Sequence, residues 1–294
     1  MAEYRSLIIG HTTLDRNTDH LGNTVEIVGG AVVYSSASAY ALGHKVLAVT
    51  RLAEKDFSRL EQFTLPKENI VCIKSEKSTD MVNIYFTADK ERRKCSCTSR
   101  GDAFTAEDIK GYDADIYHFA GLIYGDYDTE MIKTASEYGK VAVDVQGFLR
   151  HANDDGSMYF EDWADKKDIL KYITYLKTDA AEAEIMTGTS DRKKAAEILH
   201  SWGAKEILIT HNTEVLAYDG KEFFTCPIKA RNLSGRTGRG DTTFAAYINE
   251  RQEKSVEEAL LVATATVSLK METPGPFRGT KEDIDNYIET FYKA

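Results

Sequence analysis

The segment Ser234-Gly235-Arg236-Thr237-Gly238-Arg239-Gly240-Asp241-Thr242-Thr243-Phe244 is a glycine-spaced loop that leads into an apolar, helix-compatible stretch. Glycines let the backbone turn its N–H groups toward an anion without interference from Cβ, and a helix start adds unpaired donors and a favourable dipole. We expect Asp241 to stand beside that anion, where a carboxylate can accept the proton of an attacking hydroxyl. The loop therefore indicates phosphoryl transfer to an alcohol.

Thr237-Gly238-Arg239-Gly240-Asp241 resembles the T-G-A-G-D signature of the ribokinase/PfkB family of small-molecule kinases, with Arg239 in place of the alanine. The resemblance implies that Gly238, Arg239 and Gly240 form an anion hole, that Asp241 is the catalytic base and that Thr237 contacts the nucleotide. A turn capped by Asp241 without chemistry and an Arg-Gly-Asp adhesion tripeptide are the alternatives. A dinucleotide-binding fingerprint fits poorly, because the glycine order is reversed and no early βαβ unit carries it.

The composition is that of a globular protein with a sizeable core: 294 residues, of which 42% are hydrophobic and 10% aromatic. The net charge of −10 disfavours nucleic acid and anionic membranes as partners. The N-terminus has too short an apolar run for a signal peptide, and the longest weakly polar stretch is too short to span a bilayer. The four cysteines lack zinc or redox spacing. We expect a soluble, cytoplasmic protein.

Short apolar runs at residues 7–9, 46–49, 116–119, 141–143 and 207–209 are typical of buried parallel strands. Helix start signals lie between them, at Thr105, Asp191 and Ser255, and a last helix is expected from about Thr280. Most of the segment 257–271 is expected to be core packing. The alternation predicts an α/β fold, and the family resemblance implies a three-layer αβα core around a mostly parallel sheet.

Residues 12–28 and 70–98 interrupt this alternation with strand-like patterns. A few inserted strands cannot bury both faces, so one face is expected to cover a substrate cleft. The resemblance implies the same arrangement, a single kinase domain over 1–294 with a small β-sheet lid from these two insertions, which also serves as a homodimer surface.

The pair Gly29-Gly30, followed by small residues, is similar to the glycine-pair signature at which the family's backbone approaches a substrate hydroxyl. Tyr34 stands where the family commonly has asparagine. Asp15, after the first strand, matches the aspartate that accepts hydrogen bonds from substrate hydroxyls. His11 beside it is expected to pack or to donate a hydrogen bond rather than to act as a base.

Asp179 and Glu182 resemble the family's N-x-x-E segment, which organises Mg²⁺ and phosphate through water, with aspartate in place of asparagine. Residues three apart share a helix face, so both carboxylates can converge on a hydrated cation. A solvated acidic helix face is the alternative interpretation.

Other polar residues follow predicted strands, where open α/β sheets bind ligands. Gln146 and Arg150 have reach into that crevice as substrate contacts, although Arg150 suits a surface ion pair equally. Thr210 and Asn212 occupy the place of the family's T-x-G nucleotide loop, with Asn212 at the glycine position.

Together these features predict an ATP-dependent, magnesium-dependent kinase acting on a hydroxyl of a sugar or polyol, with a monovalent cation as a further candidate cofactor. Myo-inositol is a specific candidate acceptor. Two other functions stay open. One is a nucleoside kinase of the same fold, with Tyr34, Tyr85 and Phe86 as stacking surface, and the other is a catalytically silent nucleotide or sugar sensor, suggested by the departures at Tyr34, Asp179, Arg239 and Asn212.

Overall fold

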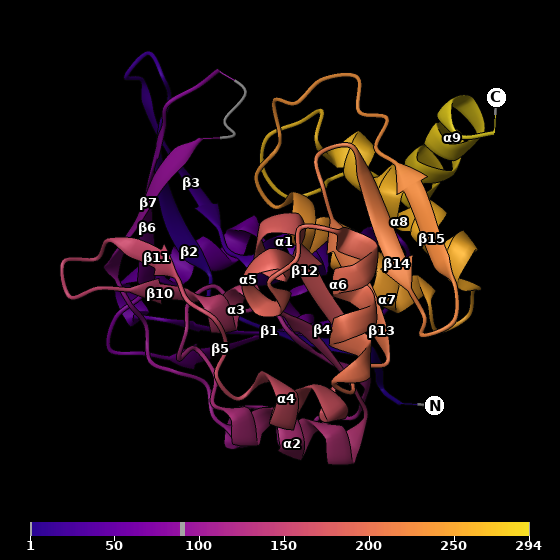
Figure 1. Cartoon of the computed structure of the whole chain (residues 1–294). Helices are drawn as coiled ribbons and strands as arrows, with labels where there is room; N and C mark the ends of the chain where they lie inside the picture. The colour runs from indigo at the N-terminus through magenta and orange to yellow at the C-terminus, as the bar shows by residue number, and fades with distance from the viewer. Residues whose placement is uncertain (1, 89–91, 294) are drawn as a thin grey trace.

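The computed structural model describes residues 2–88 and 92–293. Within them, a nine-stranded sheet runs through the molecule (Figure 1). In spatial order its strands are β15 (Phe223–Pro227), β14 (Glu214–Tyr218), β13 (Glu206–Thr210), β12 (Tyr175–Asp179), β9 (Lys140–Asp144), β8 (Ala114–Phe119), β1 (Tyr4–Ile9), β4 (Val46–Leu52) and β5 (Ile70–Lys74). The pairs from β5 to β13 are parallel, whereas β14 and β15 are antiparallel.

Every apolar run predicted to be a strand is part of this sheet, because each is buried on both faces. Successive side chains point to opposite sides, so Leu7 and Ile9 belong to one hydrophobic cluster and Ile8 to another. No apolar run predicted β12, since Lys177 and Asp179 interrupt its apolar residues.

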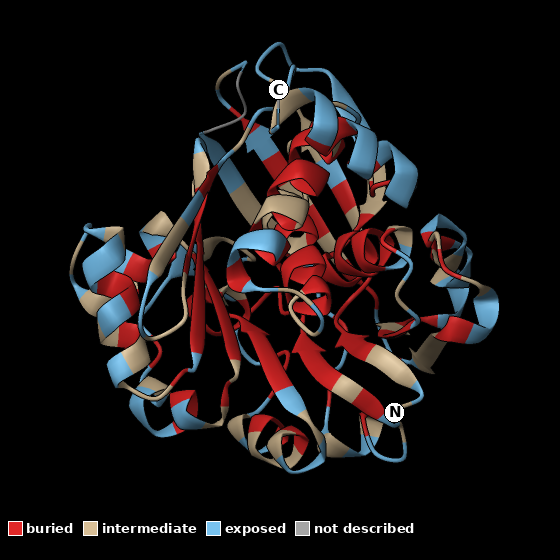
Figure 2. Cartoon of the chain, turned by 90° about the vertical axis from the view of Figure 1, so that its right-hand side faces the viewer, coloured by how far each residue is buried: buried red, intermediate tan, exposed pale blue. Residues whose placement is uncertain are grey.

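Helices cover both faces of the sheet, as predicted. One face packs against α2 (Thr129–Tyr138) and α6 (Arg192–Ser201), and the other against α1 (Ala31–Ala41), α7 (Arg239–Glu250), α8 (Val256–Lys270) and α9 (Lys281–Phe291). Figure 2 shows the buried residues gathered in the strands and in the inner helices, with exposed residues on the outer helices.

The predicted start signals act as helix caps. The side chains of Asp191, Ser255 and Thr280 accept backbone N–H groups at the starts of α6, α8 and α9. Thr105 caps only a single 3₁₀ turn. The remaining elements are short: α3 (Gln146–Leu149), α4 (Lys166–Ile169), α5 (Ala180–Thr187), β10 (Arg150–Ala152), β11 (Met158–Phe160), η1 (Glu54–Gln62), η2 (Lys67–Asn69), η3 (Ala106–Asp108) and η4 (Leu170–Tyr172).

A separate four-stranded sheet has the order β3 (Thr24–Gly29), β2 (Thr13–Thr18), β6 (Thr79–Tyr85) and β7 (Arg93–Ser99). Figure 1 shows it at one end of the molecule, away from α9 and β15. The predicted insertion 70–98 divides between the two sheets, because Val71 and Ile73 of β5 pack on the main core and β5 pairs with β4. Of this insertion, only the part from β6 onward therefore belongs to the small sheet.

Cys95 and Cys97 lie on β7 and pack against the same hydrophobic cluster. The four cysteines are free thiols. None of the helices in the described part of the chain is long and apolar enough to cross a membrane.

Candidate active site

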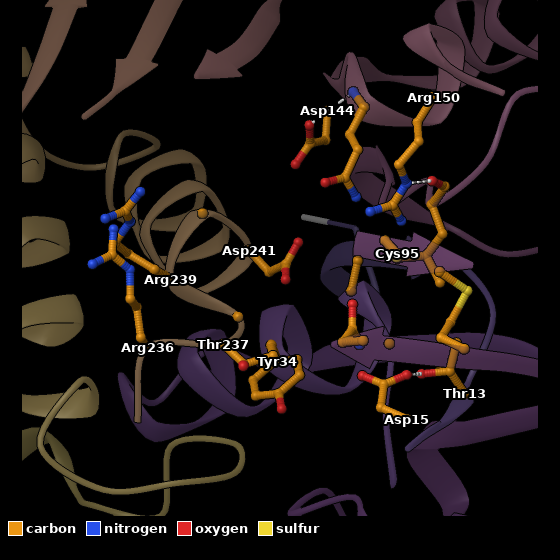
Figure 3. Close-up of a pocket in the computed structure, with 18 of the residues that line it drawn as sticks. Thr13, Asp15, Tyr34, Cys95, Asp144, Arg150, Arg236, Thr237, Arg239 and Asp241 are labelled. Carbon is orange, nitrogen blue, oxygen red and sulfur yellow. Dashed lines mark hydrogen bonds between the residues drawn. The ribbon is translucent and has the colours of Figure 1, made fainter. Parts of the chain in front are cut away.

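A cavity of about 300 Å³ lies between the small sheet and the loop that precedes α7. Its walls come from the small sheet, from the start of α1, from the carboxyl ends of β9, β12 and β13, and from residues 236–241. Ligands in open α/β sheets bind at this edge, beyond the carboxyl ends of the strands. Figure 3 shows Asp241 in the middle of the cavity, with Arg236 and Arg239 on one side and Asp15 and Arg150 on the other.

The loop before α7 presents backbone donors to this cavity. Among the described residues, the N–H groups of Gly238, Gly240 and Asp241 have no hydrogen-bond acceptor, whereas Arg239 N donates to Arg236 O at 3.3 Å. Gly238 has φ of 78°, in the left-handed region that only glycine adopts without strain, and it is the N-cap residue of α7. Thr237, Gly238, Arg239 and Gly240 all line the cavity, but the Arg239 N–H is already engaged.

Asp241 lies in the first turn of α7 and lines the cavity. Burial raises the pKa of Asp241 to about 6, with a further contribution from the charge of Asp144, while Lys177, Lys270 and Arg150 oppose the shift. The carboxylate is therefore ionised at neutral pH and still basic enough to accept a proton.

The opposite end of the cavity holds Asp15, on β2. Thr13 Oγ1 donates to Asp15 Oδ1 at 2.7 Å, and burial raises the pKa of Asp15. Gly30 lines the cavity with φ of 103°, and a Cβ there would lie 2.2 Å from His11 O. Gly29 supports Asp15 from behind, since a Cβ on it would lie 3.1 Å from Asp15 Oδ2, but it is not part of the cavity wall.

Gln146 and Arg150, the two residues predicted as substrate contacts, both line the cavity. Arg150 is 5% exposed, and its Nε donates to Leu122 O at 2.7 Å. That bond fixes the guanidinium plane, so that the terminal nitrogens are directed by the backbone rather than by a surface carboxylate. Among residues 2–88 and 92–293, no carboxylate forms an ion pair with this buried guanidinium, so the surface ion pair considered for Arg150 is not found there.

His11 is not part of the cavity wall. Its ring packs 4.7 Å from the ring of Phe104, and burial lowers its pKa. The expected packing role is confirmed.

Lys177 is a cavity residue that the sequence reasoning missed. Its Nζ lies 3.0 Å from Asp144 Oδ2 and 3.7 Å from Glu182 Oε2. Burial alone would lower the pKa of Lys177, but the charges of Asp144, Glu182, Asp179 and Asp241 outweigh it and raise that pKa. A fixed positive charge therefore lies beside the start of α7, where a Cβ on Gly240 would be 3.1 Å from Lys177 Nζ. The polar residues within the otherwise apolar strand β12 were the sequence signal that could have indicated Lys177.

Asp179 and Glu182 cap the start of α5 reciprocally. Glu182 N donates to Asp179 Oδ1 at 2.8 Å, and Asp179 N donates to Glu182 Oε2 at 2.7 Å. Asp179 lines the cavity, whereas Glu182 is 3% exposed and is not part of the wall. Burial raises the pKa of Glu182. Asp179 thus suits a hydrated cation, and Glu182 holds Asp179 in place.

No group of three or more His, Cys, Asp or Glu side chains in residues 2–88 and 92–293 is arranged to hold a metal directly. A magnesium ion in this cavity would depend on water and donor phosphate for most of its ligands, as Mg²⁺ commonly does in phosphoryl-transfer enzymes.

Asn212 joins two arginines at the far side of the cavity. Its Oδ1 accepts from Arg236 Nη2 at 2.9 Å and from Arg239 Nη1 at 2.8 Å. Thr210 lines the cavity, but Asn212 itself does not. The structure thus holds two guanidinium groups near one another beside the loop, an arrangement that favours a multiply charged anion.

The small sheet contributes four cavity side chains that were not predicted as site residues, together with Tyr85, which was considered as stacking surface for a base: Met81, Asn83, Arg93 and Cys95. On β6, Met81, Asn83 and Tyr85 alternate along the strand and are buried, while Ile84 is 40% exposed. The period-two pattern was visible, but the outward-facing set is the more apolar one, so the sequence did not show which face covers the cavity.

A family model for the pfkB family carbohydrate kinases matches residues 6–282. A solved pyrophosphate-dependent kinase in the ribokinase family, complexed with a pyrophosphate analog and myo-inositol, is 32% identical with a TM-score of 0.87, over 96% of this chain and 99% of that one. A pyrophosphate-dependent myo-inositol-1 kinase converted into a myo-inositol-3 kinase is 30% identical with a TM-score of 0.86, over 98% and 99%. These structures show that the fold is ribokinase-like.

A cytidine kinase from Thermococcus kodakarensis is 27% identical over 255 residues, 82% of this chain and 86% of that protein.

Proposed function

Because the chain belongs to the pfkB family of carbohydrate kinases, and is a phosphotransferase acting on a hydroxyl group, we propose that it phosphorylates a cyclic polyol of the inositol type. We propose pyrophosphate as the donor. The observation that carries the proposal is the position of Asp241, which faces the cavity beside N–H groups that have no acceptor among the residues that the structure describes. The predicted roles of the loop, of Asp15 and of the residues below are parts of this proposal.

The acceptor end suits a small molecule with several hydroxyl groups. Asp15 supplies a carboxylate that can accept two hydrogen bonds. Hydrogen-bond donors come from the amides of Gln146 and Asn83 and from the guanidinium of Arg150, which its bond to Leu122 O orients. The two solved relatives, one complexed with myo-inositol and the other a myo-inositol kinase, match over 96–99% of the chains at 30–32% identity, which favours the same acceptor class. The small sheet closes this end, so that transfer to the acceptor outcompetes transfer to water.

The donor end of the cavity carries more positive charge than contact with the sugar of a nucleotide requires. Arg236 and Arg239 converge on Asn212, and Lys177 lies behind Gly240. A pyrophosphate concentrates its charge on two phosphorus centres, and two guanidinium groups with backbone N–H groups match that density. ATP, expected from the family resemblance, is the competing donor. If ATP is the donor instead of pyrophosphate, Thr210 and Thr237 would contact the nucleotide.

In the proposed reaction, the acceptor oxygen attacks the nearer phosphorus of the donor. A new P–O bond forms, the bridging P–O bond breaks, and inorganic phosphate leaves with that electron pair. Asp241 accepts the hydroxyl proton, and the N–H groups of Gly238, Gly240 and Asp241 stabilise the charge on the transferring group. Mg²⁺ would neutralise charge on the donor, held by its phosphates and through water by Asp179.

The test is a kinetic panel of two donors, pyrophosphate and ATP, against four acceptors: myo-inositol, ribose, fructose and cytidine. Phosphomonoester formation is followed by ³¹P NMR. We expect kcat/KM for pyrophosphate with myo-inositol to exceed every other pair by about tenfold or more. A preference for ATP would overturn the donor, and a preference for ribose or fructose would overturn the acceptor class. Donor binding without any acceptor-dependent turnover would favour the silent sensor.

A nucleoside kinase is the second candidate, favoured by the similarity to the cytidine kinase. The phenol ring of Tyr85 lines the acceptor end and could stack on a base, but Phe86 is 57% exposed and is not part of the cavity wall. Phosphorylation of cytidine in the same panel, at a higher kcat/KM than of myo-inositol, would establish it. A homodimer through the small sheet stays a prediction, tested by sedimentation equilibrium.

A further inference from the structure

Lys270 is the last residue of α8 and is 1% exposed, yet it contacts the loop before α7. Its Nζ donates to Gly235 O at 2.5 Å and also to Thr237 O. The loop is tied to the same helix end by its backbone, since Gly235 N donates to Met271 O at 2.7 Å. The segment 257–271 was predicted to be core packing, and Lys270 departs from that role.

The amine is enclosed by three groups from other elements. Its Nζ lies 4.9 Å from the ring centroid of Tyr34 on α1, and the charge of Asp241 on α7 acts on it. The third is the pair of carbonyl oxygens of the loop. A buried ammonium is costly unless it is paired and hydrogen-bonded, and carbonyl oxygens, an aromatic face and a carboxylate are the partners that stabilise one.

The two carbonyl contacts determine where the loop's N–H groups point. The chain has no cis peptide bond among the described residues. In a trans peptide the C=O and the N–H of one unit point in opposite directions, so the Thr237 carbonyl that faces Lys270 sends the Gly238 N–H away from it. That N–H has no acceptor within the part of the chain that the structure describes.

We propose that Lys270 is a positioning residue for the donor site: its ammonium holds the carbonyls of Gly235 and Thr237 on one side of the loop, so that the N–H groups on the other side face the donor phosphate. This inference rests on the proposed function of the loop as an anion hole. Because the ammonium sits behind the loop, it is not required to touch the donor.

A positioning role differs from simple packing in what can replace the side chain. Methionine has a similar length and no charge, so Lys270→Met keeps the packing and leaves two carbonyl oxygens without a donor. Lys270→Arg keeps a cationic donor. Lys270→Ala opens space for a small amine from solution, such as ethylammonium.

The experiment measures pyrophosphate binding by calorimetry without acceptor, together with kcat and KM in the polyol assay. We expect about tenfold or weaker pyrophosphate binding in Lys270→Met, partial retention in Lys270→Arg, and recovery of Lys270→Ala by ethylammonium that leaves the wild type unchanged. Lys254→Met is the matched control, since Lys254 pairs with Glu250 by an i,i+4 contact. Melting temperatures report folding.

Wild-type binding of pyrophosphate by Lys270→Met would overturn the inference, as would a Lys270→Ala protein that ethylammonium does not restore. If Lys270→Met does not fold, the Lys270→Ala and Lys270→Arg proteins decide by the same two readouts. Because binding is measured without acceptor, a failure of polyol phosphorylation refutes the proposed function while the role of Lys270 is judged separately. Should ATP prove to be the donor, ATP is the calorimetric probe.

Discussion

The ring of Tyr34 lies directly against the backbone of Gly238, so that a Cβ added to Gly238 would stand 2.2 Å from Tyr34 Cδ1. Tyr34 is 3% exposed and cannot swing out into solvent without losing its packing. The loop and α1 therefore fit together only through a glycine, and the residue that departs from the family pattern at position 34 is part of the wall that shapes the loop.

Gly238→Ala is expected to lower both activity and stability. Its φ of 78° costs an alanine about 1 kcal/mol, and the clash with Tyr34 adds to it and displaces the N–H groups. Gly188→Ala is the matched control, since Gly188 has φ of 74° and open space around its Cα. Melting temperature and pyrophosphate affinity measured in both variants separate the two costs. Equal losses in the two variants would contradict the role of the Tyr34 contact.

The site residues that could be predicted best from the sequence are those that lie together in one short segment. Gly238, Gly240 and Asp241 are contiguous, so their spacing alone indicated a loop, a helix start and a carboxylate in one place. Lys177 and Lys270 could not be found this way, because Asp144, the nearest partner of Lys177, and the carbonyls that Lys270 contacts are more than thirty residues away in the chain. Each lysine also lies in a segment made largely of buried residues, and only the contact between elements distant in the chain shows what its charge interacts with.

Arg236→Gln and Arg239→Gln are each expected to raise KM for pyrophosphate by about tenfold, because each removes charge-assisted hydrogen bonds to a phosphate. The KM for the acceptor should change little, since both guanidinium groups lie on the opposite side of Asp241 from Asp15 (Figure 3). Arg192→Gln, which removes an ion pair with Glu214, is the control. Initial rates at varied pyrophosphate decide, and an unchanged KM in both variants would remove the arginines from the donor site.

The activity should follow a bell-shaped pH profile. Asp241 must be deprotonated to accept the hydroxyl proton, so kcat/KM rises as pH passes about 6. Burial lowers the pKa of Lys270 to about 7, against the charge of Asp241, so the ammonium is lost as pH rises further and the rate falls. Lys270→Arg should remove the alkaline fall, because arginine stays charged. A profile of Lys270→Arg identical to that of the wild type would refute this assignment.

The ionised carboxylate of Asp241 is also expected to lower the free energy of unfolding. Its folded-state pKa is raised to about 6, above the value of an unfolded aspartate, so folding favours the protonated form. The stabilisation is fully present below about pH 4 and is lost as pH rises through about 6. Asp241→Asn should therefore raise the free energy of unfolding at pH 8 by about 1–2 kcal/mol, discounted because the side chain is partly exposed, and by much less at pH 4. Denaturant titrations at both pH values measure it, and a destabilised variant at pH 8 would contradict the burial argument.

The central claim is tested most directly by the turnover of Asp241→Asn, measured as phosphomonoester formation from pyrophosphate and myo-inositol, with pyrophosphate affinity measured in parallel. Asp285→Asn, on an exposed part of α9, controls for the loss of a carboxylate. We predict that kcat falls by about a hundredfold or more while the pyrophosphate Kd stays within about threefold of the wild type. Near-normal turnover in Asp241→Asn would show that another group accepts the proton, and the proposed mechanism would be wrong.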